Sequence, residues 1–419
     1  MSQTRAIAVT GIGLVTPLGF GVADSWAALL AGKSGVRPIT RFATDNLKTR
    51  FAASVMLPAE SGGRFVSAAD RLHAYAGMAA EEALAMAGLG GRGGFPGPLV
   101  LGMPPIEVEL PDRLALLARA ETPDYAGLTT AAVQPGLADR TLMMAAPSRL
   151  AARFGTRGAP ISLTTACATG VTALQVAMEA IRFGEADCVL CISGESSIQT
   201  EALIRFSLLQ ALSTRNDSPE TASRPFDATR DGFVMAEGAA CLVLESAAHA
   251  KARGAKPMGW VLGGGEFADG FHRTRANPDG STIVTAMQRA LDDAGIAPGQ
   301  VDYINAHGTS TPENDKMESA GIHAVFGATP PPVSSNKSSI GHSISASGAI
   351  EAVFSLLTIR DGMLPPTINY TTPDPAITLD VVPNVARAAR VQRVLSNSFG
   401  FGGQNSCLVL GAEPESGAP

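Results

Sequence analysis

The stretch Ser162-Leu163-Thr164-Thr165-Ala166-Cys167-Ala168-Thr169-Gly170 places a single thiol among small residues. A β-prone run, residues 160–165, leads into it, and residues 171–181 are a run of strong helix formers. The pattern predicts a strand, a tight turn and the start of a helix, with Cys167 at the turn. A helix N-terminus carries partial positive charge, which favours a thiolate over a thiol. Two interpretations fit this stretch: a nucleophilic cysteine and a buried structural cysteine.

Composition excludes several classes of protein. The chain has 419 residues and a net charge of -6, with 45% hydrophobic and 17% charged residues, which is typical of a globular protein with a large core. It contains no run of basic residues, so we expect no nucleic-acid partner. No apolar stretch reaches the roughly 18 residues of a membrane-spanning helix, so we expect no membrane insertion. The short apolar run near the N-terminus lacks a cleavage-site pattern and is interpreted as a strand.

The five cysteines are scattered and odd in number, which favours a reducing compartment and a cytoplasmic location. Cys188-Val189-Leu190-Cys191 has the spacing of a redox or zinc motif, but it lies in an apolar run that reads as a buried strand. Residues three apart on a strand point to opposite faces. We therefore interpret both residues as core cysteines and expect no metal site.

Strands and helices alternate along the chain, which predicts an α/β architecture. A helix over residues 68–87 ends at Gly88, and a second amphipathic helix over residues 281–294 ends at Gly295. Both are followed by a short apolar strand, at residues 99–102 and 301–306, and in both halves the polar turns come later. This internal echo suggests duplication of one βα-rich unit. A shorter helix is expected over residues 24–31, capped by Asp24.

Three polar stretches in the second half carry candidate chemistry. His307 follows a predicted strand in a loop of glycine and hydroxyl residues. Lys337 and His342 share a loop before a helix that contains Glu351, and residues 396–405 form a glycine-rich loop. One cysteine and two histidines suit thioester chemistry. The thiolate can attack an acyl thioester, imidazoles can donate hydrogen bonds to an enolate, and backbone N–H groups can hold an oxyanion.

At this point the sequence resembles the β-ketoacyl-[acyl carrier protein] synthases of the elongating class, in the thiolase superfamily. The resemblance spans nearly the whole chain, and its motifs occur in one order. They are Val9-Thr10-Gly11-Ile12-Gly13, Thr16-Pro17-Leu18-Gly19, Thr165-Ala166-Cys167-Ala168-Thr169-Gly170, Ala211-Leu212-Ser213-Thr214-Arg215-Asn216-Asp217, Arg224-Pro225-Phe226-Asp227, His307-Gly308-Thr309-Ser310-Thr311-Pro312, Asn314-Asp315-Lys316, Lys337, Gly341-His342 and Asn397-Ser398-Phe399-Gly400-Phe401-Gly402-Gly403.

The resemblance implies the thiolase fold, in which two similar α/β halves form five layers, α-β-α-β-α. Residues 1–255 would carry the nucleophilic cysteine, and residues 256–419 the two histidines and the Gly-Phe-Gly-Gly loop. It also implies a homodimer. The implied reaction is a decarboxylating Claisen condensation of an acyl thioester with malonyl-acyl carrier protein, in fatty acid or related lipid or polyketide biosynthesis. No resident cofactor is implied, because phosphopantetheine arrives on the acyl carrier protein.

The resemblance also implies roles for individual residues. Cys167 would accept the acyl chain, while His307 and His342 would promote decarboxylation and stabilise the enolate. The N–H groups of Cys167 and Phe401 would form the oxyanion hole, and Lys337 with Glu351 would be the supporting pair. Residues matching substrate-binding positions are Thr309, Thr311, Phe206, Phe401 and Gly402. Asp315 would be structural.

Two departures from the family pattern concern substrate and partner. Met103-Pro104-Pro105 replaces a glycine-rich loop that shapes the acyl pocket in relatives. Basic residues that meet the acidic carrier protein are replaced by Ser67-Ala68-Ala69 and Gln210. Arg71, Arg205 or Arg41 would then substitute for them, unless the carrier is a specialised one.

Related folds with other activities provide the alternatives. A biosynthetic thiolase needs a second catalytic cysteine near the last glycine-rich loop, whereas Cys407 lies past that loop in an expected core strand. A starter synthase would carry asparagine in place of His342. A chain-length-controlling homologue would lack the cysteine, and Cys167 is present. A non-condensing protein that only binds a carrier protein remains as the other alternative.

Overall fold

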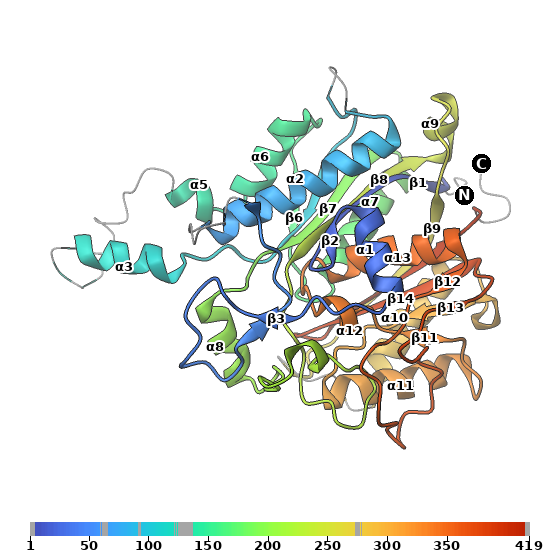
Figure 1. Cartoon of the computed structure of the whole chain (residues 1–419). Helices are drawn as coiled ribbons and strands as arrows, with labels where there is room; N and C mark the ends of the chain where they lie inside the picture. Colours follow the sequence, from blue (N-terminus) through green and yellow to red (C-terminus); the bar gives the residue numbers. More distant parts are fainter. Residues whose placement is uncertain are drawn as a thin grey trace.

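One mixed sheet of 11 strands runs through the described chain (Figure 1). The computed structural model describes residues 5–58, 60, 66–90, 94–120, 122, 124, 137–272, 277 and 279–414. From one edge to the other, the strands are β11 (Val333–Ser334), β10 (Tyr303–Asn305), β14 (Arg393–Gly400), β15 (Gln404–Gly411), β9 (Gly259–Ala268), β1 (Ile7–Thr16), β8 (Gly238–Ser246), β7 (Cys188–Glu195), β5 (Leu99–Gly102) and β6 (Ile161–Leu163). The short strand β2 (Gly19–Phe20) pairs with β1 outside this path.

The sheet consists of two halves with the same strand order. From the centre outward, one half runs β1-β8-β7-β5-β6 and the other runs β9-β15-β14-β10-β11. In each half the first three strands are antiparallel and the outer pairings are parallel. The halves meet where residues 7–9 of β1 pair antiparallel with residues 259–261 of β9. This matched topology is what duplication of one unit would produce. The division expected between residues 255 and 256, in the connection before β9, stays a prediction.

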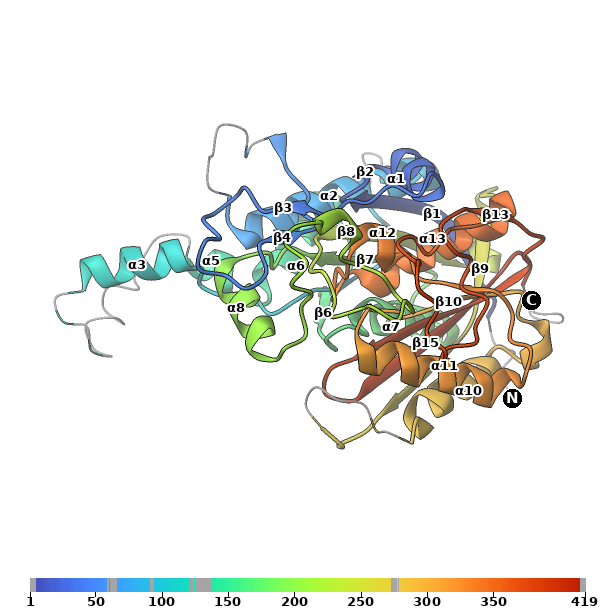
Figure 2. The ribbon, with the colours of Figure 1, turned by 60° about the horizontal axis from the view of Figure 1, so that its bottom comes forward.

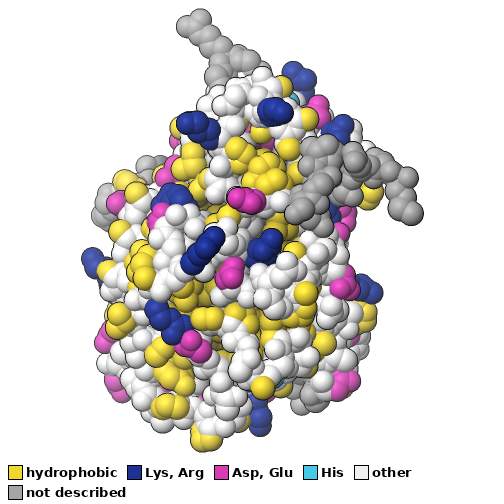
Figure 3. Space-filling model, turned by 90° about the vertical axis from the view of Figure 1, so that its right-hand side faces the viewer, with side chains coloured by type: hydrophobic (Ala, Val, Ile, Leu, Met, Phe, Trp, Pro, Cys, Tyr) yellow, Lys and Arg dark blue, Asp and Glu magenta, His cyan; other side chains and the backbone are white. Residues whose placement is uncertain are grey.

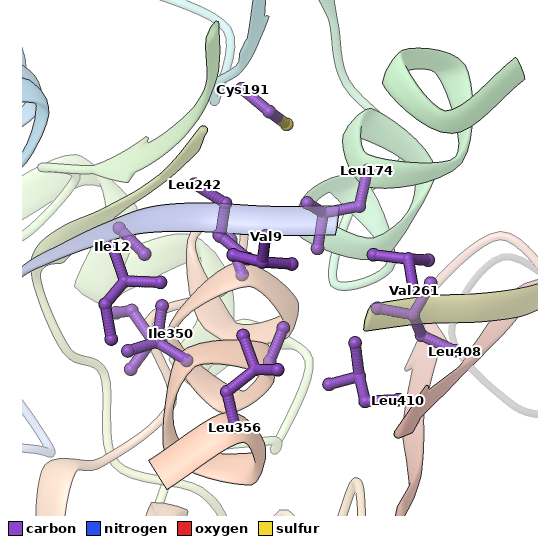
Figure 4. Packing of buried hydrophobic residues seen from close by; sticks show 14 of the residues in the cluster. Val9, Ile12, Leu174, Cys191, Leu242, Val261, Ile350, Leu356, Leu408 and Leu410 are labelled. Carbon is purple, nitrogen blue, oxygen red and sulfur yellow. The ribbon is translucent and has the colours of Figure 1, made fainter. Parts of the chain in front are cut away.

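Two helices lie between the half-sheets. They are α7 (Thr169–Arg182) and α13 (Ser347–Asp361), and their apolar residues share one core cluster with residues of β1, β7, β8, β9 and β15. Figure 4 shows this packing, with Leu174 of α7 and Leu356 of α13 among side chains from both halves. On the outer faces lie α2 (Ala68–Ala87) and α6 (Ala145–Phe154) in one half, and α10 (Ser281–Asp293) and α11 (Pro312–Phe326) in the other. The order of layers is therefore α-β-α-β-α.

Small residues let the two central helices approach each other closely. A Cβ on Gly170 of α7 would lie 2.5 Å from the backbone nitrogen of Ala349 in α13. A Cβ on Gly348 would lie 2.7 Å from the side chain of Val171. Both distances are shorter than real carbon contacts, so the contact requires glycine. It brings the N-terminal ends of both helices together. Cys167 lies just before α7, and His342 lies shortly before α13.

One helix stands away from the layered body. Figures 1 and 2 show α3 (Leu110–Arg119) projecting to one side of the molecule. None of its residues is buried, and Leu110, Leu114 and Leu117 are 40%, 55% and 48% exposed along one face. The other described elements are α1 (Val22–Leu30), α5 (Leu137–Thr141), α8 (Thr200–Leu208), α9 (Ala247–Ala252), α12 (Lys337–Ile340), η2 (Pro219–Thr221), η3 (Pro298–Gln300), β3 (Arg37–Pro38), β4 (Phe51–Ala52), β12 (Met363–Leu364) and β13 (Arg387–Ala388).

The structure confirms several local predictions. Helix α2 has the expected bounds, and Gly88 ends it in the left-handed conformation. Cys188 and Cys191 are buried in β7 and contribute to core clusters on opposite faces of the sheet, so the core interpretation holds. Cys407 is buried in β15. The expected cap of the first helix is wrong, because α1 begins at Val22 and Asp24 lies within its first turn.

The described surface shows no concentration of one charge on the face drawn in Figure 3. Lys and Arg side chains are interspersed there with Asp and Glu. None of the described helices has the length and apolar character that crossing a membrane requires.

Candidate active site

Cys167 lies at a sharp turn between β6 and α7, as predicted. Ala166, immediately before it, adopts a left-handed conformation with φ 49°. The side chain of Thr169 holds the turn: its hydroxyl donates to the Ala166 carbonyl at 2.6 Å and accepts from the Thr165 N–H at 2.8 Å. A strained backbone fixed in this way is common at functional sites. The turn points the thiol toward the other half of the molecule.

The fold brings the predicted cysteine and histidines together. The Nε2 atom of His342 lies 3.1 Å from the Sγ atom of Cys167. The rings of His307 and His342 meet edge to face, with centroids 5.3 Å apart. The three side chains are buried, at 7% exposure or less, and one ligand atom from each lies within 4.8 Å of the others. Such a set is also able to hold a metal ion, and the expectation of a metal-free site stays a prediction.

His307 is held by a carboxylate that no motif in the sequence indicated. Glu318 of α11 accepts the backbone N–H of His307 at 2.8 Å and that of Gly308 at 2.7 Å. The side-chain amide of Asn397 donates to the same carboxylate at 3.1 Å. Glu318 is fully buried, and burial raises its pKa to about 7. Its position 11 residues after the histidine gave no local signal, because α11 only folds back over the loop in three dimensions.

The backbone of His342 is fixed by a neighbouring segment before β8. Its N–H donates to the Val234 carbonyl at 2.7 Å, and its carbonyl accepts from the Ala236 N–H at 3.0 Å. The Phe233 ring packs edge to face against the imidazole, with centroids 5.3 Å apart. Gly341 precedes the histidine with φ 70°, a conformation that favours glycine. These contacts fix the position of the imidazole beside Phe233 and His307.

The electrostatics of the site oppose the expected thiolate. Burial raises the pKa of Cys167 to about 11, although the Phe401 N–H and the positive charge of Lys337 act in the other direction. Burial holds the pKa of His307 and of His342 well below the ordinary value, and the positive charge of Lys337 adds to this effect. Near pH 7 the sulfur therefore keeps its proton and both imidazoles are neutral. The helix N-terminus does not outweigh the cost of burying a charge.

Lys337 and Glu351 form an ion pair that links α12 to α13. Both side chains are at most 1% exposed. Burial raises the pKa of Glu351 to about 7, and Lys337 acts against this rise. Within the described part of the chain, neither Lys337 nor Glu351 makes a hydrogen bond to an imidazole. The pair acts on the histidines through its charge, because the Lys337 cation disfavours protonation of both rings.

The two N–H groups assigned to the oxyanion hole converge on the thiol. Both the Phe401 N–H and the N–H of Cys167 itself lower the pKa of the sulfur. A Cβ on Gly400 would lie 3.3 Å from the Cys167 nitrogen, so the glycine-rich loop lies directly against the nucleophile turn. Phe401 is half-buried in a cluster with Phe206, and Gly402 is exposed with φ 88°.

The remaining predicted residues lie near the imidazoles, in the loop after His307 or through ring contacts with His342. The Oγ1 atoms of Thr309 and Thr311 are 2.9 Å apart, just after His307. Phe206 of α8 contacts Phe233 edge to face at 5.4 Å between centroids, and Phe233 in turn contacts His342. Asp315 is buried and accepts the backbone N–H groups of Phe226 and Ser310, as a structural residue would.

Two of the three arginines expected to meet a carrier protein are unavailable. Arg71 is 1% exposed and lies between Glu60, Glu109 and Glu237. The Arg41 side chain is 11% exposed and pairs with Glu60 and Glu237. Burial of these guanidinium groups in ion pairs overturns their assignment to an external partner. Arg205 of α8 is 53% exposed and paired with Glu107, so it is the remaining one of the three.

Comparison with known proteins matches most of the chain to the two domains of one family. Residues 4–94 and 110–250 match the family described as "Beta-ketoacyl synthase, N-terminal domain", and residues 258–371 match "Beta-ketoacyl synthase, C-terminal domain". The chain belongs to the β-ketoacyl synthase family. It is 41% identical to the 3-oxoacyl-[acyl-carrier-protein] synthase 2 of Coxiella burnetii, over 97% of this chain and 99% of the relative.

Solved structures of β-ketoacyl synthases confirm the predicted thiolase fold. A crystal structure of a β-ketoacyl synthase from Burkholderia phymatum superposes with a TM-score of 0.86 at 35% identity, covering 97% of this chain and 99% of that one. A ketosynthase bound to a hexaketide, in complex with its type II PKS acyl-carrier protein, gives a TM-score of 0.85 at 32% identity, covering 98% and 100%.

Proposed function

We propose that the chain catalyses the decarboxylating Claisen condensation of an acyl thioester with malonyl-acyl carrier protein. The product is β-ketoacyl-acyl carrier protein, made for fatty acid or related lipid or polyketide biosynthesis. The observation that carries the proposal is the buried Cys167 thiol, with one imidazole 3.1 Å away and a second imidazole against the first. Relatives named 3-oxoacyl-[acyl-carrier-protein] synthase 2 support the reaction class.

The first half-reaction transfers the acyl group to Cys167. The thiol loses its proton to Nε2 of His342 as the sulfur attacks the thioester carbonyl. The N–H groups of Cys167 and Phe401 stabilise the tetrahedral oxyanion, and a donor in this role contributes about 3 kcal/mol. The carrier-protein sulfur then leaves and takes the proton back from His342. Because the resting pair is neutral, the thiolate forms only as the substrate arrives.

The second half-reaction forms the carbon–carbon bond. Nε2–H groups of His307 and His342 donate to the malonyl thioester oxygen, so that loss of CO2 leaves an enolate stabilised by two hydrogen bonds. The enolate carbon attacks the acyl group on Cys167 and expels the sulfur as a thiolate, which then takes up one proton from solvent. Neutral imidazoles are needed for this role, and burial together with the Lys337 charge keeps both rings neutral.

The acyl carrier protein is the proposed partner. One structural relative is a ketosynthase in complex with an acyl-carrier protein. The carrier brings phosphopantetheine to the site, so the protein needs no resident cofactor. Thr309 and Thr311 offer hydroxyl groups beside His307 for this arm. The cytoplasmic location stays a prediction.

A condensation assay with acyl-carrier and malonyl-carrier protein tests the function. The alternative is a homologue that binds carrier proteins or sets chain length without condensing, and the complete set of Cys167, His307 and His342 argues against it. The expected result is β-ketoacyl product from the wild-type chain and none from Cys167→Ala. Absence of product with every carrier tested, together with an unmodified Cys167, would favour the alternative.

We also propose a homodimer. The leucine face of α3 projects into solvent, and β6 ends the sheet with one edge unpaired in the described chain. Exposed apolar faces and open sheet edges favour association. Light scattering should give twice the 43.0 kDa mass of one chain. Leu114→Glu with Leu117→Glu should lower that mass, and an unchanged mass would remove α3 from the interface.

A further inference from the structure

The Nδ1 atom of His342 contacts a residue to which the family resemblance assigned no role. It lies 2.9 Å from the Oγ atom of Ser347, the first residue of α13. Ser347 is 1% exposed, and the Oγ atom of Ser343 lies 3.3 Å from its own. The hydroxyl, the imidazole and the Cys167 sulfur therefore form one hydrogen-bonded line, through Nδ1 on one side of the ring and Nε2 on the other.

The second histidine of the site is held differently. The Nδ1 atom of His307 is buried and has no hydrogen-bond partner among the described residues. Its position depends on the backbone bonds to Glu318 and on contacts with neighbouring rings. The hydroxyl contact is thus specific to the imidazole that faces the thiol.

The two half-reactions require different tautomers of His342. To receive the thiol proton, Nε2 must present a lone pair, which places the ring proton on Nδ1. To donate to the malonyl thioester oxygen, Nε2 must carry the proton, which leaves Nδ1 as an acceptor. Interconversion of these tautomers changes no net charge, since one nitrogen loses the proton that the other gains. A buried ring nitrogen left without a partner costs about 1 to 3 kcal/mol.

We propose that Ser347 is a positioning residue that pairs with Nδ1 of His342 in both tautomers, so that the same ring serves both half-reactions. A hydroxyl carries one proton and two lone pairs and rotates freely, so it donates to Nδ1 in one tautomer and accepts from it in the other. A backbone N–H or carbonyl would stabilise only one of the two. The proposal deepens the proposed function and rests on it for the roles of His342.

Kinetics of Ser347→Ala, Ser347→Thr and Ser355→Ala test the proposal. Ser355 is the matched control, because it is equally buried in α13 and, among the described residues, its hydroxyl bonds only the Glu351 carbonyl in the same helix. We expect Ser347→Ala to slow both acylation and malonyl decarboxylation by about five- to tenfold in kcat, with KM unchanged. Ser347→Thr should restore most of the rate, and Ser355→Ala should retain it. Equal rates in Ser347→Ala and the control, or no rescue by threonine, would overturn the role.

A second measurement needs neither a variant of Ser347 nor a substrate. Nitrogen-15 NMR of the histidine-labelled full chain, assigned through His342→Gln, reports the tautomer of the ring. Shifts intermediate between the two neutral tautomers are expected for His342 in Cys167→Ala, where no thiol proton is donated to Nε2. A single fixed tautomer would contradict the proposal. Failure to form product in the condensation assay would instead overturn the proposed function, so the two failures are distinguishable.

Discussion

Replacing Lys337 by methionine is expected to destabilise the protein in a pH-dependent way. Methionine keeps much of the side-chain length but removes the cation that faces Glu351 in the buried pair. In the wild type, burial raises the pKa of Glu351 to about 7 even with Lys337 present. Without the cation, the pKa of this carboxyl rises further, because nothing offsets the cost of burying its charge.

The sign of the pH effect follows from this shift. A carboxyl whose pKa is raised on folding stabilises the folded state below its unfolded pKa of about 4.3, and the stabilisation is lost as pH rises through the folded value. In the wild type this loss ends near pH 7, where Glu351 ionises beside Lys337. In Lys337→Met the loss continues, at about 1.4 kcal/mol per pH unit. The variant should fall about 3 kcal/mol below wild type by pH 9, within the 3 to 5 kcal/mol typical of a broken buried pair.

Urea unfolding at pH 6, 7.5 and 9 measures this difference. The control is Lys337→Met combined with Glu351→Gln, which leaves no ionisable group in the pair. The single variant should lose stability progressively above pH 7 relative to wild type, and the double variant should not. The same loss at all three pH values in the single variant would show that ionisation of Glu351 is not its cause. Alkylation of Cys167 by iodoacetamide should also slow, since Lys337 lowers the pKa of the thiol.

Four further substitutions test separate features of the site and of the helix packing behind it. Cys167→Gln should still decarboxylate malonyl-carrier protein, because both histidines remain; a rate of zero would count against their role. His342→Ala should slow iodoacetamide alkylation of the thiol at least tenfold, since it removes the imidazole 3.1 Å from the sulfur. His307→Ala should leave alkylation near the wild-type rate, and equal slowing in both variants would contradict this division. Gly170→Ala should lower the free energy of unfolding by about 1 to 3 kcal/mol, because its Cβ would lie 2.5 Å from a backbone nitrogen of α13. Gly299→Ala, with open space around it, is the control, and a similar loss there would argue against close helix packing.

Local signals in the sequence predicted much of the fold. The 20-residue helix α2 was predictable because its Gly88 stop is encoded next to the element it ends. The start of α1 was not, since the N–H of Val22 is satisfied by Glu82, a residue 60 positions away on α2. Capping by a distant side chain leaves no pattern near the helix. The internal echo predicted two halves, whereas the strand order within each half required the structure.

The residues of the site likewise separate into those with a local sequence signal and those without one. Cys167, His307 and His342 were recognisable because each lies in a short motif of glycine and hydroxyl residues. Glu318 and Ser347 were not, because each contacts its histidine from a helix that follows the loop, and no sequence pattern marks that contact. The charge state of the thiol required the structure, since proximity to a helix start is visible in sequence and full burial is not. Burial likewise removed Arg71 and Arg41 from the set of surface cations.

Mass spectrometry of the protein shows whether Cys167 carries the acyl group during condensation. The chain is incubated with acyl-carrier protein, its mass is recorded, and malonyl-carrier protein is then added. We expect an acyl adduct, located by digestion on the peptide that contains Cys167, and its disappearance as β-ketoacyl-carrier protein forms. An unmodified Cys167, or an adduct that persists after malonyl-carrier protein is added, would contradict this expectation.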